Sequence, residues 1–145
     1  MTRDETIKVL AILKAAYPNS YRGMTKEEAN GTVAVWASQF ANIPVNIVMI
    51  AVNKHISTNT FPPSINEVKE RIRGLYWETW EMLDFHHRGF KKLDDKTVAQ
   101  LEKIIEIVEP MRTREKLEPT LGELLEGYSG YLSGGGRDGL KQIEE

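Results

Sequence analysis

The chain has 145 residues, of which 41% are hydrophobic and 28% are charged, and its formal net charge is −2. This is the size and composition of one ordinary globular domain, not of a disordered or fibrous chain. There is no cysteine, which excludes disulfide bonds and any zinc or iron–sulfur centre with cysteine ligands.

Charge is distributed unevenly along the chain. Residues 1–93 hold 12 Lys and Arg against 9 Asp and Glu, whereas residues 94–145 hold 7 against 12. The chain therefore lacks the basic character of a dedicated nucleic-acid-binding protein, and direct binding to nucleic acid is not expected. No apolar run approaches the roughly 18 residues of a membrane span, and the N-terminus has no signal-peptide pattern. We expect a cytoplasmic protein that makes no membrane contact.

Capping boxes predict where three helices of the first part begin. Each box pairs a Ser or Thr with a Glu three residues later: Thr2 with Glu5, Thr25 with Glu28, and Ser64 with Glu67. Pro44 suits the first position of another helix, in which apolar residues recur with helical spacing as far as Ile56. We therefore predict about four helices, which form an N-terminal domain at residues 1–85.

The pattern in the second part of the chain differs from that of the N-terminal domain. We expect a loop at residues 86–94, then C-terminal helices at residues 95–132, with Asp94 or Asp95 capping the first and Pro119 opening the second. The run of Gly134, Gly135 and Gly136 indicates a flexible tail at residues 133–145. The predicted fold class is all-α: a compact bundle of about four N-terminal helices, one or two further amphipathic helices, and a flexible glycine-rich tail.

The sequence offers little that resembles a catalytic site. No glycine-rich phosphate loop and no nucleophile-elbow pattern is present. His86 and His87 are adjacent, so on a helix their side chains would point about 100° apart and would not easily share a metal ion. We predict a protein that is not an enzyme and that needs neither a metal nor a cofactor.

An apolar stripe in the acidic second part is the first candidate partner-binding site. Its members are Leu117, Leu121, Leu124, Leu125, Tyr128 and Tyr131. Such an amphipathic helix either docks on the N-terminal domain or folds into a groove of another protein.

A basic and aromatic region is the second candidate, for nucleic acid or for another partner. Its members are Lys69, Arg73, Trp77, Arg88, Lys91 and Lys92. Basic side chains among aromatic rings can bind single strands, but the interpretation we favour is that the cations line the solvated side of a helix. The aromatic cluster Tyr76, Trp77, Trp80, Phe85 and Phe90 likewise either packs in the core or contacts a partner.

The first half of the chain resembles the phage replicative-helicase loader/inhibitor family. The resemblance covers about residues 1–73. It rests on residues 1–19, on Thr32–Trp36, and on the Phe61–Val68 turn into a helix, which come in the family's order and at about its spacing.

The resemblance implies a helical N-terminal domain and a small phage protein in the host cytoplasm that has no enzymatic activity. Family members bind the hexameric replicative helicase, hold it inactive, and help deliver it to an origin-bound initiator. Two alternatives remain open: a phage protein of the same fold that inhibits a different host or defence protein, and a DNA-binding replication accessory protein.

Overall fold

The computed structural model describes residues 1–112 and 119–132, the last six of these by their backbone alone. Every regular element in these residues is a helix, which confirms the all-α fold class. The elements in chain order are α1 (Arg3–Ala16), η1 (Pro18–Ser20), α2 (Lys26–Gln39), α3 (Val45–Thr58), α4 (Ile65–His87), α5 (Asp95–Val108), η2 (Glu109–Met111) and α7 (Leu121–Leu132). The tail predicted at residues 133–145 lies outside the described residues.

All three predicted capping boxes are present, at the starts of α1, α2 and α4. In each box the hydroxyl oxygen accepts the backbone amide of the glutamate at 3.2 Å, and the carboxylate accepts the amide of the capping residue. Asp94 caps α5 in a similar way, accepting the amide of Thr97 at 2.6 Å. Local hydrogen bonds therefore fix where these four helices begin.

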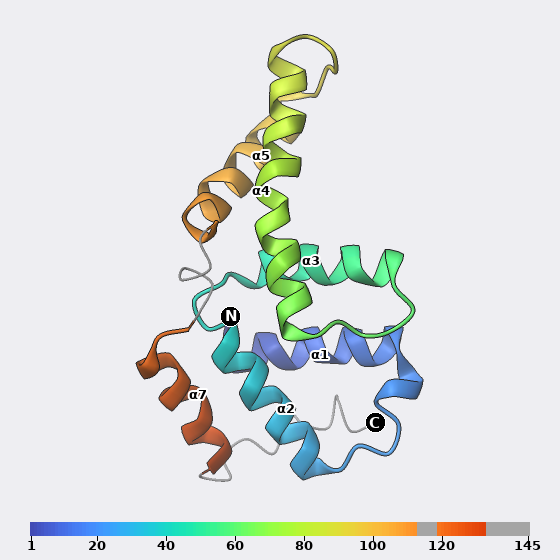
Figure 1. Cartoon of the computed structure of the whole chain (residues 1–145), viewed down its shortest axis with the longest axis vertical. Helices are drawn as coiled ribbons and strands as arrows, with labels where there is room; N and C mark the ends of the chain where they lie inside the picture. The colour runs from blue at the N-terminus through green and yellow to red at the C-terminus, as the bar shows by residue number, and fades with distance from the viewer. Residues whose placement is uncertain (113–118, 133–145) are drawn as a thin grey trace.

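The body of the molecule consists of residues 1–72, which form α1, α2, α3 and the start of α4 (Figure 1). Its core side chains are among the largest that are fully buried: Leu10, Leu13, Phe40, Ile43, Ile47 and Ile72. The N-terminal ammonium of Met1 also donates hydrogen bonds to the carbonyls of Phe40, Ala41 and Ile43, at 2.7 to 3.0 Å. These contacts fasten the start of α1 to the end of α2.

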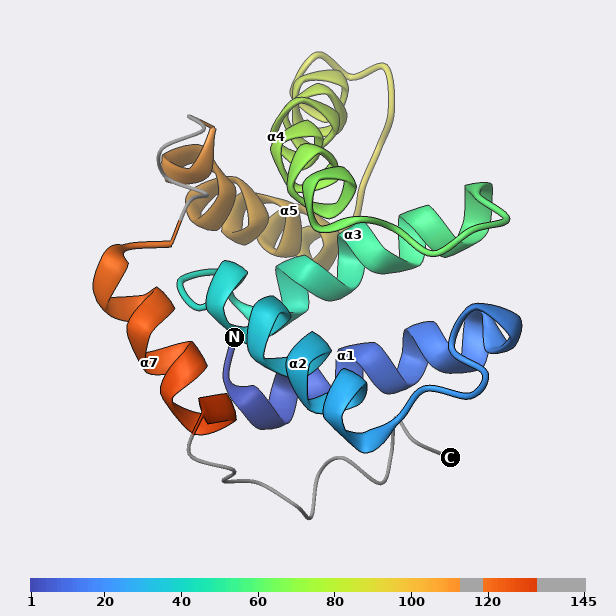
Figure 2. The ribbon, with the colours of Figure 1, turned by 60° about the horizontal axis from the view of Figure 1, so that its bottom comes forward.

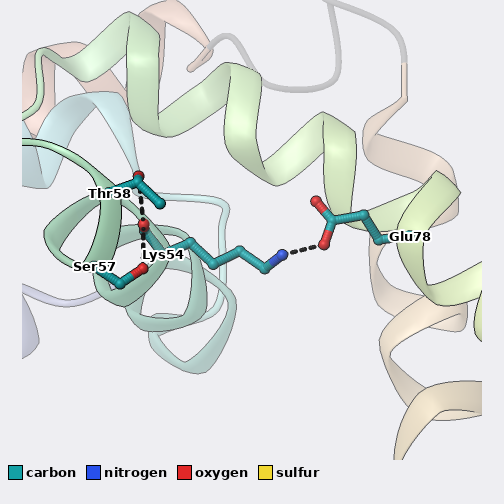
Figure 3. Close-up of polar contacts among 4 residues, drawn as sticks. All are labelled: Lys54, Ser57, Thr58 and Glu78. Carbon is teal, nitrogen blue, oxygen red and sulfur yellow. Dashed lines mark hydrogen bonds and ion pairs between the residues drawn. The ribbon is translucent and has the colours of Figure 1, made fainter.

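An arm rises from the body, built from the later part of α4 and from α5 (residues 73–108), which pack side by side (Figure 1). α4 has 23 residues, and at 1.5 Å per residue it is about 34 Å long, which carries it well beyond the body. Val108 at the end of α5 is fully buried in the body's core cluster, so the arm is anchored where it returns. Lys54 of α3 forms an ion pair with Glu78 of α4 on the surface near the base of the arm (Figure 3).

The helix α4 is longer than the sequence pattern predicts. It runs through Gly74 without interruption and includes His86 and His87, so the loop predicted at residues 86–94 begins two residues later. At the opposite end of the molecule, α7 lies along α2 (Figure 2). No helix among the described residues is long and apolar enough to span a membrane.

Candidate partner-binding surfaces

A capping box also positions α7. Thr120 donates its amide and its hydroxyl to the carboxylate of Glu123, at 2.7 and 3.0 Å, and its hydroxyl oxygen accepts the Glu123 amide at 3.3 Å. Acidic side chains in the first turn suit the positive end of the helix dipole. The helix predicted after Pro119 therefore forms, and its backbone packs against α2 rather than standing apart from the body.

The leucines of α7 do not all face the same way. Leu124 is partly buried, whereas Leu121 is 73% exposed and Leu125 is 64% exposed. We call Leu121 and Leu125 the α7 ridge; they are four residues apart and so lie on one face of the helix. Leu117 and the side chains of Tyr128 and Tyr131 lie outside what the structure describes.

A hollow lies at one side of the contact between α7 and α2. Its volume is about 470 Å³, and it is lined by Glu123 and Glu126 of α7, by Ala37 and Ala41, and by the first residues of the chain. Beside this hollow, α7 and α2 pack closely against each other.

The structure does not bring the second candidate set together. The prediction that Lys69 belongs to an exposed basic surface is wrong, because its side chain is buried. Its Nζ donates to Oε1 of Gln39 at 2.8 Å and lies 5.8 Å from the centroid of the Phe40 ring. The aliphatic part of the Lys69 side chain therefore covers apolar core residues, while its ammonium group is hydrogen-bonded.

Arg73 and Trp77 line a hollow of about 670 Å³ on the side of the arm, which also includes Arg112. The guanidinium of Arg112 lies 4.3 Å from the ring centroid of Tyr76 and 4.9 Å from that of Trp77. Two cation–π contacts at this distance hold the end of η2 against α4. Sequence reasoning missed Arg112, since no local pattern connects it with aromatic rings so much earlier in the chain.

The aromatic cluster divides between core and surface. Tyr76 is buried, whereas Trp77 is 58% exposed and Trp80 is 47% exposed. The rings of these two tryptophans meet edge to face at 6.5 Å. Tyr76 therefore packs in the core, whereas Trp77 and Trp80 lie on the surface, where contact with a partner stays a prediction.

The remaining residues gather at the far end of the arm, which we call the arm tip: Phe85, Arg88, Phe90, Lys91 and Lys92. Gly89 ends α4 with φ +79°, a conformation that favours glycine. The amide of Phe90 then donates to the carbonyl of Phe85 at 2.9 Å, and that of Gly89 donates to His86 at 3.0 Å. This pair of bonds is a Schellman motif, and it fixes the path of the loop.

Side chains of the types that bind metal ions, and ion pairs, are also present among the described residues. No group of three or more His, Asp or Glu side chains in residues 1–112 and 119–132 could hold a metal ion. The side chains of three ion pairs in this part of the chain, including that of Arg88 with Asp84, are exposed or partly exposed. Its distinctive features are instead exposed apolar side chains on the arm and on α7.

The body of the molecule matches a known protein family. Residues 1–69 match the family model of the gp39 N-terminal domain. This is the N-terminal domain of a phage family of helicase loaders and inhibitors. The match covers just under half of the chain and ends soon after α4 begins, so the arm and α7 lie beyond the gp39-like domain. No curated protein and no solved structure matches the chain.

Proposed function

We propose that this chain is a non-enzymatic phage protein that binds the hexameric replicative DNA helicase, inhibits it and aids its loading at the origin. The match of residues 1–69 to the gp39 N-terminal domain carries the proposal. The protein acts stoichiometrically in the host cytoplasm. It binds helicase subunits, holds an inactive state, and releases them near an origin-bound initiator.

The α7 ridge supplies the helicase contact in this proposal. Leu121 and Leu125 present an exposed apolar face four residues apart, which is the spacing with which an amphipathic helix enters a groove. Leu117, Tyr128 and Tyr131 continue the stripe in sequence, and we assign them to the same contact. Leu124, which the sequence placed in the same stripe, is partly buried and is left out of it.

The first experiment mixes the purified full chain with a purified bacterial hexameric replicative helicase. We expect a complex by size-exclusion chromatography with light scattering, and suppression of the helicase's ATPase and unwinding rates. Absence of binding at micromolar concentrations would overturn the proposal.

A matched pair of variants then tests the α7 ridge. Leu125→Gln keeps a good helix former while removing the apolar group, and we expect at least about a tenfold loss of affinity if it is a central contact. Phe61→Gln is the control, because Phe61 is 76% exposed on the body, far from α7 in sequence. Equal binding by both variants would exclude Leu125 from the interface.

A second candidate function rests on the part of the chain beyond the match. The described residues after residue 69 carry most of the exposed large apolar groups and lie outside the matched domain. A protein with this body and a different arm would inhibit a different host or defence protein. Affinity purification from host lysate, with the helicase found or not found among the bound proteins, separates the two.

A further inference from the structure

Hydrogen bonds hold the backbone of the arm tip. Besides the two bonds of the Schellman motif, the amide of Lys91 donates to the carbonyl of Phe85 at 3.3 Å. The amide of Leu93 donates to Nδ1 of His86 at 3.1 Å, and Arg88 pairs with Asp84 at 3.0 Å. These contacts tie the backbone on both sides of the loop to the last turn of α4.

The loop carries an exposed apolar group that is next to basic residues in the sequence. Phe90 is 77% exposed, and its ring meets that of Phe85, itself 43% exposed, edge to face at 6.3 Å. Residues 86–93 hold Arg88, Lys91 and Lys92 and no acidic residue. A phenylalanine held in water on a preorganised loop gains nothing for stability, but it loses little entropy when a partner covers it.

The charge of the loop specifies the chemistry of a complementary partner. Arg88 already pairs with Asp84, so Lys91 and Lys92, both exposed beside Phe90 in the sequence, are the cations that attract an acidic surface. The exposed phenylalanine in turn fits an apolar socket. The occupant that fits is a protein surface with an apolar socket rimmed by Asp and Glu.

Single-stranded nucleic acid fits the arm tip less well. Successive bases stack on rings that lie roughly parallel, whereas the planes of Phe85 and Phe90 meet at 82°. Binding to nucleic acid also relies on neutralising several phosphates. The arm tip offers only Lys91 and Lys92 beside the paired Arg88, with Asp94 and Asp95 close by in the sequence, which suits a local contact with a few acidic side chains better.

We propose that the arm tip is a second docking site for the helicase, separate from the α7 ridge, and that it inserts Phe90 into an apolar socket with an acidic rim. The proposal rests on the proposed function. The arm tip and α7 stand at opposite ends of the molecule (Figure 1). A protein that binds the helicase through both sites gains affinity from the second contact, because that contact forms within an existing complex.

A matched pair of phenylalanine variants tests the apolar contact. Phe90→Ala and Phe61→Ala remove the same side chain from positions that are 77% and 76% exposed. Helicase binding to each full-length variant is measured by fluorescence anisotropy. We expect Phe90→Ala to weaken binding at least about tenfold and Phe61→Ala to leave it unchanged.

A matched pair of charge reversals tests the acidic rim. Lys91→Glu with Lys92→Glu changes the charge by the same amount as Lys8→Glu with Lys26→Glu, and all four lysines are exposed. We expect only the first pair to weaken helicase binding and to reduce its dependence on salt.

The possible outcomes distinguish this inference from the proposed function. If wild-type protein binds the helicase and the arm-tip variants bind equally well, the arm tip is not a docking site and the proposed function stands. If wild-type protein does not bind the helicase, both fall. If wild-type protein binds a fluorescent oligothymidylate and the arm-tip variants do not, the occupant is nucleic acid, and the protein-socket proposal is overturned.

Discussion

The body and the remainder of the chain treat their large apolar side chains in opposite ways. Residues 1–72 leave only Ile12 and Phe61 exposed. The later described residues leave six exposed: Trp77, Trp80, Phe85, Phe90, Leu121 and Leu125. Exposed apolar groups that are clustered mark interaction sites more often than scattered ones do. The difference supports the proposal that the body provides stability while the arm and α7 provide contacts with a partner.

The boundary between these regions lies close to the end of the family match. The gp39-like domain ends at residue 69, and the first of the clustered exposed aromatic side chains is Trp77. A common scaffold with a variable set of contacts beyond it would give this arrangement. The predictions below test whether stability and binding are divided in this way.

The largest expected effect comes from the same substitution made in each region. Phe40 is fully buried and packs against Trp36, with ring centroids 5.4 Å apart. Phe40→Ala should lower the free energy of unfolding by about 3–5 kcal/mol, whereas Phe90→Ala should change it by less than about 0.5 kcal/mol. Urea denaturation of the two variants measures both values. Similar losses would show that the arm tip is part of the stabilising core.

A smaller effect is expected where the arm loop turns. Gly89 has φ +79°, so Gly89→Ala should cost about 1–2 kcal/mol of strain. The loss should appear as faster hydrogen exchange at the amides of Phe90 and Lys91, while amides in the body keep their protection. Uniform loss of protection would show that the arm and the body unfold as one unit.

Acid should weaken the start of α4. The backbone hydrogen bond from Ser64 holds the pKa of Glu67 below its ordinary value of 4.5. A lowered carboxyl pKa contributes stability above pH 4.5, and this contribution is lost as the pH falls further through the folded-state pKa. Glu67→Gln should therefore flatten the fall in unfolding free energy between about pH 6 and pH 3. An unchanged slope would assign the acid sensitivity to other groups, such as Glu5 and Asp94, whose pKa values are also lowered by backbone hydrogen bonds.

The smallest effect is expected at the ion pair beside the base of the arm. The Lys54 and Glu78 side chains are 40% and 56% exposed, and such surface pairs contribute less than about 1 kcal/mol. Lys54→Met keeps the apolar stem and removes the charge. Thermal unfolding should show a small change that disappears at high salt. A loss that persists in high salt would mean that packing, not charge, links α3 to the arm.

The features that the sequence predicts correctly are local ones. A capping box such as Thr2 with Glu5 is complete within four residues, so its pattern and its structure coincide. The same holds for the α-helical periods of the body and for the cap at Asp94.

The features that the sequence misses depend on contacts between distant residues. Lys69 is buried because the fold brings it beside Phe40 and beside Gln39, which is 30 residues earlier in the chain. The division of the α7 leucines, with Leu124 turned inward and Leu125 outward, depends on how α7 packs on α2. No local pattern records either arrangement, so the candidate site was only partly predictable.

The most direct measurement of the division between scaffold and contact surface combines affinity and stability on one sample. The full-length variant with Leu121→Gln and Leu125→Gln is titrated against a hexameric replicative helicase, and its unfolding free energy is measured beside that of the wild type. We expect the unfolding free energy to stay within about 0.5 kcal/mol while affinity falls at least about tenfold. Unchanged affinity, or a wild-type protein that does not bind the helicase, would contradict the account.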